Sequence, residues 1–444
     1  MDDWLKQHPE IKSLRPIIAD LNGQPRGKRF PARMGQKLCD SGMRMPLSVL
    51  NLDICGDDIK DSPLVFASGD ADGELRATER GFVPVPWTES PAALLPMSMY
   101  LEDGRPFEGD PRHALRAVAD RYKARDWTPV VATELEFFLV DDSGDTLRPP
   151  HSPRSGKRRH GGEILSMRAL DAFDDFFSEL YDACDAMDIP AEATISEGGV
   201  GQYEVNLTHV ADAMKAADDA WLFKQLTKGL ARKHGFAATF MAKPYAEHSG
   251  TGMHTHFSVI DAQGRNIFDD GSSEGNDQLR HAIAGCLAAI PGSTLIFAPH
   301  ANSYARFEAG SHAPTGIGWG YENRTAAIRV PAGASAARRI EHRVAGGDIN
   351  PYLMLSVVLG AAFLGMEDHM QAPAPITGSA YEAGLPQLPT LWGDAIDRFE
   401  TDPLIARILP QVLIENLVMT KRQEIAIDAR LSDADRIALY LDTV

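Results

Sequence analysis

Cysteine is scarce in this chain of 444 residues, and its four cysteines are scattered without a CxxC pair: Cys39, Cys55, Cys184 and Cys286. This spacing argues against a zinc knot and a disulfide framework, and predicts buried, inert thiols. The sequence also lacks an apolar run of the length that a membrane span needs, so no membrane partner is expected. Its first residues are acidic where a secretory signal would be basic and then apolar, which predicts a cytoplasmic protein.

Positive charge is in deficit, with 44 Lys and Arg against 62 Asp and Glu and a net charge of −18. An acidic protein repels nucleic acid and attracts metal ions or protonated amines. A nucleic-acid partner is therefore not expected, and a cationic substrate is favoured.

The pattern of the sequence changes near Gly109, from short β-prone runs to an apolar-periodic helix, and we predict two domains, 1–109 and 110–444. The first mixes short β-prone runs with Gly, Pro and Asp turns, as in a small sheet-containing domain. Asp110 and Pro111 then open an apolar-periodic helix, with the acid at the N-cap and the proline in the first turn.

The second part mixes strands and helices in an irregular order. β-rich runs are separated by long predicted helices over 167–187 and 211–235, which indicates an α+β fold rather than strict βαβ winding. Residues 148–162 contain three prolines and five Lys or Arg residues and are predicted to form a surface loop or flap.

Acidic side chains gather on β-prone segments. In VVATELEFFLV (130–140), Glu134 and Glu136 point to one face because side chains alternate along a strand. Carboxylates that lie close repel each other unless a cation sits between them, so this pair is either a metal-site candidate or a solvated strand face. Three glycines between Glu197 and Glu204 allow a turn that brings these two acids together, in a site or in a surface hairpin.

Histidine and arginine follow on later segments. In GTGMHTHFSV, His254 and His256 share one strand face, as ligands or as structural side chains. In RRIEHRVA, Arg339, Glu341 and Arg343 share a charged face, which could also be a solvated edge. Three further arginines stand among small residues and turns, a density that suits phosphate and carboxylate binding: Arg306, Arg324 and Arg329.

Taken in order, these blocks resemble those of glutamine synthetases: ELE, EGGVGQYE, SGTGMHTHFS, NSYAR, NRTAAIRVP, and RRIEHR followed by NPYL. Each block is weak alone, but their order and spacing are specific, and the resemblance covers nearly the whole chain. It is strongest to the branch that γ-glutamylates polyamines and other small amines, through ATFMAKPYAEHSGTGMH, WGYENRTAAIRVP and HRVAGGDINPYL.

The resemblance implies an α+β, glutamine-synthetase-like fold with a small N-terminal β-grasp domain and a large catalytic domain built on a curved antiparallel sheet. It implies a homo-oligomer, a dodecamer of two stacked six-membered rings with active sites between subunits. L-glutamate, ATP and a small amine or polyamine are the expected substrates, and Mg²⁺ or Mn²⁺ is the expected cofactor, with two or more ions per site.

The resemblance also carries residue roles by position. One metal site would be held by Glu136, Glu197 and Glu204. The second would be held by Glu134, His254 and Glu341, and its imidazole makes it more tolerant of Mn²⁺. The glutamate side would use Glu136, Gly250, His254, Arg306 and Arg343. The nucleotide side would use His256, Ser258, Arg324 and Arg329. The catalytic set would be Arg324, Arg329, His312 and, from an adjacent subunit, Asp53, with Asp57 and Asp58 as alternatives to Asp53.

Three positions depart from the family's pattern. Ser249 stands where ammonia-using members have Asn, and Ala337 stands where a nucleotide-side Lys is common. His312 stands where ammonia-using members place a glutamate that takes a proton from ammonium. We therefore expect a γ-glutamyl amide of a diamine or polyamine, formed through γ-glutamyl phosphate. The alternatives are a monoamine such as methylamine or ethanolamine, ammonia itself, a guanidino kinase, and a structural relative without activity.

Overall fold

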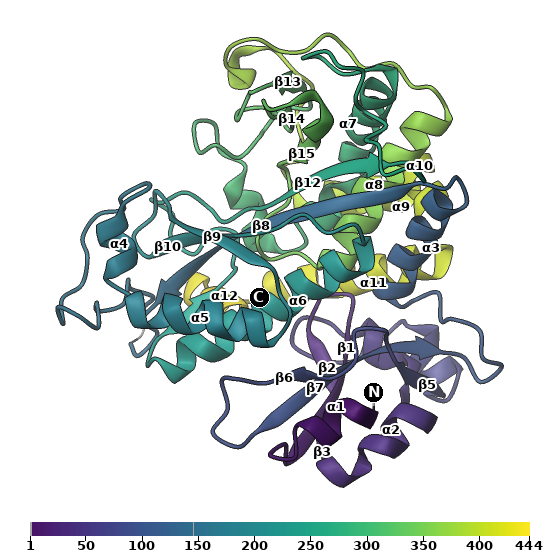
Figure 1. The fold of residues 1–444 in the computed structure, drawn as a ribbon, viewed down its shortest axis with the longest axis vertical. Coiled ribbons are helices and arrows are strands. Elements are labelled where there is room, and N and C mark those ends of the chain that lie inside the picture. Colours follow the sequence, from purple (N-terminus) through teal and green to yellow (C-terminus); the bar gives the residue numbers. More distant parts are fainter. Residues whose placement is uncertain (1, 145) are drawn as a thin grey trace.

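The computed structural model describes residues 2–144 and 146–444, and this part of the chain contains two β-sheets (Figure 1). The small sheet has the order β2-β1-β7-β5-β4, with β3 paired to β1 and β6 paired to β7. Its strands are β1 (Ser13–Ala19), β2 (Pro25–Gly27), β3 (Phe30–Pro31), β4 (Met43–Pro46), β5 (Asp72–Ala77), β6 (Val83–Pro84) and β7 (Ala92–Tyr100). Two short helices accompany it, α1 (Asp2–Gln7) and α2 (Gly35–Ser41).

The two faces of the small sheet pack in different cores. Ile18 and Leu95 belong to a hydrophobic cluster confined to the first 107 residues, whereas Ile17 and Leu94 belong to the main core of the molecule. This split follows from the alternation of side chains along β1 and β7. One face of the N-terminal part is thus built against the rest of the chain, and Gly109 remains our proposed domain boundary.

The large sheet has the order β13-β14-β15-β12-β8-β10-β9, with β11 paired to β8. Its strands are β8 (Thr128–Val140), β9 (Ala191–Ser196), β10 (Gln202–Leu207), β11 (Ala237–Thr239), β12 (Met253–Ile260), β13 (Trp319–Tyr321), β14 (Ile328–Val330) and β15 (Ile340–His342). Within the described residues, its pairs are antiparallel except β13 with β14. The mixture of this sheet with long helices confirms the α+β class.

The helices that follow residue 109 pack on the large sheet and on one another. They are α3 (Pro111–Lys123), α4 (Met167–Asp171), α5 (Asp174–Ala186), α6 (Ala213–Lys233), α7 (Asp277–Phe297), α8 (Pro351–Glu367), α9 (Trp392–Thr401), α10 (Pro403–Ile408), α11 (Gln411–Asp428) and α12 (Asp433–Thr443). Helices α3 and α6 contact β8, and α8 packs on α3, α6 and α7 (Figure 1). The opposite face of the central strands stays free for polar side chains.

Local sequence signals place most of these elements. The predicted cap is present, because the Asp110 carboxylate accepts a hydrogen bond of 2.8 Å from the Arg112 amide at the start of α3. The helix predicted over 211–235 is α6. The helix predicted over 167–187 is instead split into α4 and α5, because Phe173 leaves helical geometry and buries its ring against Tyr203 and Phe236.

Two expectations about burial need correction. Helix α7 is long and apolar enough to cross a membrane, but 78% of its apolar window is buried inside the molecule, as in the core helix of a globular protein. Cys184 and Cys286 are buried as predicted, whereas Cys39 is half-buried and Cys55 is exposed. Partial burial and the neighbouring Asp53 carboxylate raise the pKa of the Cys55 thiol, so it remains a weak nucleophile.

Helix α11 ties the N-terminal part to the end of the chain through buried polar contacts. The Asn22 amide donates to the Glu424 carboxylate at 2.9 Å, and the Lys421 ammonium pairs with the same carboxylate at 2.8 Å. The Asn51 amide donates to the Thr420 hydroxyl at 2.7 Å. These groups are fully buried, so each depends on its partner to offset the cost of leaving water.

Candidate active site

Strand pairing lines up charged side chains across the large sheet. Glu136 of β8 lies opposite Glu204 of β10, and Glu134 lies opposite His254 of β12. Leu135, between the two glutamates, points into the main core and fixes the face on which they stand. The register therefore gathers on one face the acids and the histidine that lie far apart in the sequence.

The row continues onto the next two strands. His256 of β12 lies opposite Glu341 of β15, which in turn lies opposite Arg329 of β14. The Arg329 guanidinium contacts the Glu341 carboxylate at 2.7 Å, and Arg343 holds its other oxygen. Strand β15 is thus an inner strand with Glu341 only 1% exposed, which excludes the solvated edge as an interpretation of this segment.

The acids on this face carry more negative charge than the protein neutralises. Burial and the neighbouring Glu136 carboxylate together raise the pKa of Glu197 to about 7. Burial also raises the pKa of Glu204 well above its usual range, together with the charges of Glu134 and Glu136. Such carboxylates favour a bound cation, because a cation removes the repulsion that otherwise makes them bind protons.

Two groups of side chains have the geometry of metal ligands. In each, one donor atom per residue lies within 4.8 Å of the others: Glu134, His256 and Glu341 in one, and Glu134, Glu204 and His254 in the other. His254 and His256 contact the Glu134 carboxylate at 3.2 and 3.0 Å. Burial alone would raise the pKa of Glu134, but these hydrogen bonds hold it well below its usual value.

This donor set fits divalent metals, since carboxylate oxygens suit Mg²⁺ and an added imidazole suits Mn²⁺. The two groups differ from those expected from the sequence in two respects. Glu204, expected with Glu136 and Glu197, lies with Glu134 and His254. His256, expected on the nucleotide side, lies with Glu134 and Glu341, and the roles of the predicted ligands in either group remain predictions.

A cavity of about 640 Å³, which we call the acidic cavity, opens above this face of the sheet. It is lined by thirteen of the fifteen residues predicted for the site: Glu134, Glu136, Glu197, Glu204, Gly250, His254, His256, Arg306, His312, Arg324, Arg329, Glu341 and Arg343. Ser258 instead lines a neighbouring cavity, together with Asn266 and Ala336. Ala336 directly precedes Ala337, the position where the family commonly has Lys. The structure thus brings the predicted metal ligands, the arginines and His312 together around one cavity.

Asp53 is the other predicted residue outside the cavity. It is 0% exposed, and its carboxylate accepts hydrogen bonds from the amides of Cys55 and Asp57 at 3.0 Å and from the Gln423 side chain at 2.7 Å. Within the single chain this carboxylate is therefore already paired, and its expected place opposite the amine site of an adjacent subunit stays a prediction. Asp57 and Asp58, the two alternatives, are exposed.

The glutamate-side wall depends on close backbone approach. A Cβ atom on Gly250 would lie 2.3 Å from the Ala242 carbonyl oxygen, and one on Gly252 would lie 2.9 Å from the Arg306 guanidinium. Arg306 is buried behind them and donates a hydrogen bond of 2.7 Å to the Val344 carbonyl. Glycine at both positions lets this arginine reach the cavity.

His312 stands exposed on the loop at the rim of the acidic cavity, with a left-handed φ of 62°. The loop is anchored on both sides of it. The Ser311 hydroxyl donates to the Glu308 carbonyl at 2.6 Å, and the Tyr381 hydroxyl donates to the Ala313 carbonyl at 2.9 Å. These hydrogen bonds hold the backbone in a conformation that L residues rarely adopt, at the point where His312 lines the cavity.

Several lining residues were missed by the sequence reasoning. Gln202 and Asn206 flank Glu204 at a spacing of two on β10 and donate at 3.0 Å to the carboxylates of Glu136 and Glu204. Extending the strand alternation to these amides would have found them. Arg339 donates a hydrogen bond of 3.3 Å to His256. The centroid of the His209 ring lies 6.3 Å from that of the His256 ring. Glu192 and His209 carry no such signal because they lie outside the motifs.

Comparison with known proteins gives consistent results. Residues 108–436 match the family model of the glutamine synthetase catalytic domain. A gamma-glutamylputrescine synthetase of Escherichia coli (strain K12) is 35% identical over 91% of this chain and 86% of its own length. A gamma-glutamylethanolamide synthetase of Streptomyces coelicolor is 30% identical over 96% and 91%. The apo structure of GmaS without ligand superposes with a TM-score of 0.84 at 28% identity, covering 97% of both chains.

Proposed function

The chain belongs to the glutamine synthetase family and is a glutamate–amine ligase, and from this premise we propose that its amine is a diamine or polyamine. In the reaction, the γ-carboxylate of L-glutamate attacks the γ-phosphate of ATP and ADP leaves. The amine nitrogen then attacks the carbonyl of γ-glutamyl phosphate, and phosphate leaves as the amide bond forms. The amine gives up one proton in this second step.

Metal ions would be held by the carboxylates and histidines of the large sheet: Glu134, Glu136, Glu197, Glu204, His254 and Glu341. When bound, Mg²⁺ or Mn²⁺ supplies positive charge to the phosphate oxygens of ATP. The protein contributes the register that fixes these ligands and the amides of Gln202 and Asn206 that orient two of them.

Arginines supply the remaining positive charge of the acidic cavity. Arg329 and Arg343 are held in place by Glu341, and Arg324 is exposed to the cavity from the turn after β13. We assign Arg324 and Arg329 to the transferred phosphate and Arg306 to the α-carboxylate of glutamate. Guanidinium groups suit both tasks, because they bind planar oxygen pairs through two parallel hydrogen bonds.

The observation that carries the choice of amine is His312 at the rim of the acidic cavity. A neutral imidazole can take the proton that an attacking amine loses, but it cannot attract ammonium as a carboxylate would. A diamine does not need that attraction, because its distal ammonium can bind the acids of the cavity and orient the reacting nitrogen. Glu192, exposed on the wall, is one such acid.

The relatives support two classes of amine. The E. coli relative named for putrescine is 35% identical, and the Streptomyces relative named for ethanolamide is 30% identical. The higher identity supports a diamine, while ethanolamine and other small monoamines form the second candidate class.

The test is phosphate release from ATP with L-glutamate across a panel of putrescine, spermidine, n-butylamine, methylamine, ethanolamine and ammonium. We expect the highest kcat/KM for putrescine or spermidine. n-Butylamine is the matched control, because it has the carbon chain of putrescine without the second ammonium. A higher kcat/KM for ethanolamine, methylamine or ammonium, or equal values for butylamine and putrescine, would overturn the diamine assignment.

We also propose that the protein acts as a homo-oligomer, a dodecamer with active sites between subunits. Exposed apolar side chains on two distant surfaces support association: Phe66, which is 80% exposed, in the N-terminal part, and Ile164, Leu165 and Met167 beside the acidic cavity. Light scattering should give a mass of twelve chains, and Phe66→Ser should lower it. A monomer at micromolar concentration would contradict this assembly.

A further inference from the structure

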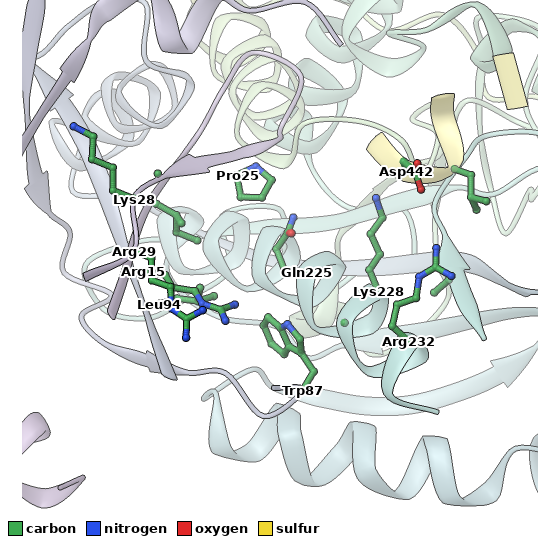
Figure 2. A pocket seen from close by; sticks show the side chains of 15 residues that line it. Arg15, Pro25, Lys28, Arg29, Trp87, Leu94, Gln225, Lys228, Arg232 and Asp442 are labelled. Atoms are coloured by element: carbon green, nitrogen blue, oxygen red, sulfur yellow. The ribbon is translucent and has the colours of Figure 1, made fainter. Parts of the chain in front are cut away.

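A second cavity of about 560 Å³ lies between the N-terminal part and helix α6 (Figure 2). Its walls come from β1, from the segment 25–29, from α6 and from α12. We call it the basic cavity. None of its lining residues lines the acidic cavity, so it is separate from the site of the ligase reaction.

Positive charge dominates the basic cavity. Five cations line it against one acid, Asp442: Arg15, Lys28, Arg29, Lys228 and Arg232. Arg232 is paired with Asp142 at 2.7 Å, and Lys28 donates to the Arg44 carbonyl at 2.8 Å. Within residues 2–144 and 146–444, no carboxylate lies at ion-pair distance from the other three, although the protein as a whole carries a net charge of −18.

Two of the three unpaired cations, Arg15 and Lys228, are partly buried, so water compensates their charge less well than on an open surface. Burial, together with the charges of Lys224 and Arg232 on the same helix, lowers the pKa of the half-buried Lys228 to about 7, against the opposing charge of Asp442. Burial and the neighbouring Arg29 lower the pKa of Arg15. An anion in the cavity would relieve both effects.

The floor of the cavity is apolar and closely packed. A Cβ atom on Gly229 would lie 2.3 Å from the Trp87 ring, so glycine lets the indole rest directly on α6. Figure 2 shows Arg15 and Arg29 on one side of Trp87, and Lys228 and Arg232 on the other side. Leu94 completes the apolar surface on the strand side.

We propose that the basic cavity binds a small organic anion with two negatively charged groups, one held by Arg15 and Arg29 and the other by Lys228 and Arg232. Its apolar body would lie over Trp87. Carboxylates and phosphates share the chemistry that arginine and lysine recognise, so either can supply the two charges. The ligand would join the N-terminal part to α6, which packs under β8, the strand that carries Glu134 and Glu136.

The test is calorimetric titration and thermal unfolding of the full-length protein with four probes: glutarate, pyrophosphate, inorganic phosphate and acetate. We expect glutarate or pyrophosphate to bind and raise Tm, and acetate to bind far more weakly. Lys228→Gln and Arg15→Gln should each weaken binding at least about tenfold, since each removes a charged hydrogen-bond donor. Comparing glutarate with pyrophosphate shows whether the cavity prefers a dicarboxylate or a phosphate.

Two control variants locate the binding. Lys37→Gln removes an exposed lysine far from either cavity and should bind the probes as the unchanged protein does. Arg324→Gln alters the acidic cavity and should leave this binding intact. The proposal would be overturned if neither dianion binds, if both basic-cavity variants bind as tightly as the unchanged protein, or if binding is lost in Arg324→Gln alone. None of these readouts depends on amine turnover, so this proposal and the proposed function fail separately.

Discussion

The acidic cavity and the basic cavity enclose similar volumes, about 640 and 560 Å³, but they hold their charges in different ways. In the acidic cavity, backbone pairing places Glu204 opposite Glu136 and Glu134 opposite His254. In the basic cavity, Arg15 on β1 lies beside Lys28 and Arg29 between β2 and β3, which pair with β1. Lys228 and Arg232 lie on α6, which no ladder joins to this sheet. A sheet can therefore maintain like charges at close range without a ligand, whereas separate segments gain order from the ligand that they share.

The largest effect is expected from removing one charge of the paired set. Glu204→Gln should lower turnover at saturating ATP and Mg²⁺ by more than about a thousandfold. This loss exceeds the one expected from removing a single hydrogen bond to the transition state, because the substitution weakens metal binding. The metal-free variant should unfold at the same Tm as the unchanged protein or higher, because the substitution also removes repulsion. Activity and Tm with and without Mg²⁺ check this, and Glu415→Gln on the exposed surface of α11 is the control. Retained turnover would remove Glu204 from the metal site.

The two cavities also predict stability changes of opposite sign with pH. For the metal-free protein, the folded pKa of Glu197 is about 7 against 4.5 for the unfolded group. The native state therefore binds more protons, and its unfolding free energy should rise as pH falls from about 7 to 5. A pKa difference of about 2.5 corresponds to about 3 kcal/mol, and Glu197→Gln should reduce this slope by the contribution of that group.

Lys228 gives the opposite sign, because its folded pKa of about 7 lies below the usual 10.5. The native state then binds fewer protons, so stability should rise as pH rises above about 7, and Lys228→Gln should reduce this rise. Urea unfolding in EDTA between pH 5 and 9 measures both slopes. Slopes that both variants leave unchanged would mean that neither cavity stores unbalanced charge.

A smaller effect is expected from an arginine that the sheet holds in place. Arg329→Ala should lower the rate of phosphoryl transfer by about a hundredfold with little change in the KM for the amine, because its charge is needed before the amine attacks. Arg329→Lys should recover part of the rate, since it can still pair with Glu341. Single-turnover ADP formation checks the step. A change confined to the KM for the amine would place Arg329 at the amine site instead.

The smallest effect concerns the loop at the rim, which no strand ladder fixes. His312→Glu should raise kcat/KM for ammonium relative to putrescine by about tenfold, because a carboxylate attracts ammonium and accepts its proton. His312→Gln is the matched control, since it keeps polarity without adding charge. Equal ratios in the two variants would show that residue 312 does not select the amine.

The sequence predicts correctly which side chains share a face within a single strand, because that depends only on alternation along the strand. Alternation within β8 and β12 places Glu134 with Glu136 and His254 with His256, and the structure confirms both faces. It could not supply the register between strands, which depends on partners far along the chain. His256, which the family resemblance places on the nucleotide side, lies with Glu134 and Glu341, and its role stays a prediction.

Features built from distant segments escaped prediction. Asp53 lies in a β-prone, turn-rich segment, but its carboxylate is buried by Gln423, which lies 370 positions later. The basic cavity joins cations at positions 15, 29, 228 and 232, and none of them belongs to a motif. The break at Phe173 is likewise decided by the aromatic rings that it meets in the core.

The contact of α11 with the N-terminal part has a consequence for the order of synthesis. Asn22 leaves the ribosome early, but its partner Glu424 follows 402 positions later. The buried polar groups beside the small sheet therefore stay without their partners until most of the chain has been synthesised. Contacts of such long sequence separation form slowly and leave surfaces exposed to aggregation in the meantime. A nascent chain arrested before α11 should hold an incompletely docked N-terminal part that proteases cleave and chaperones retain.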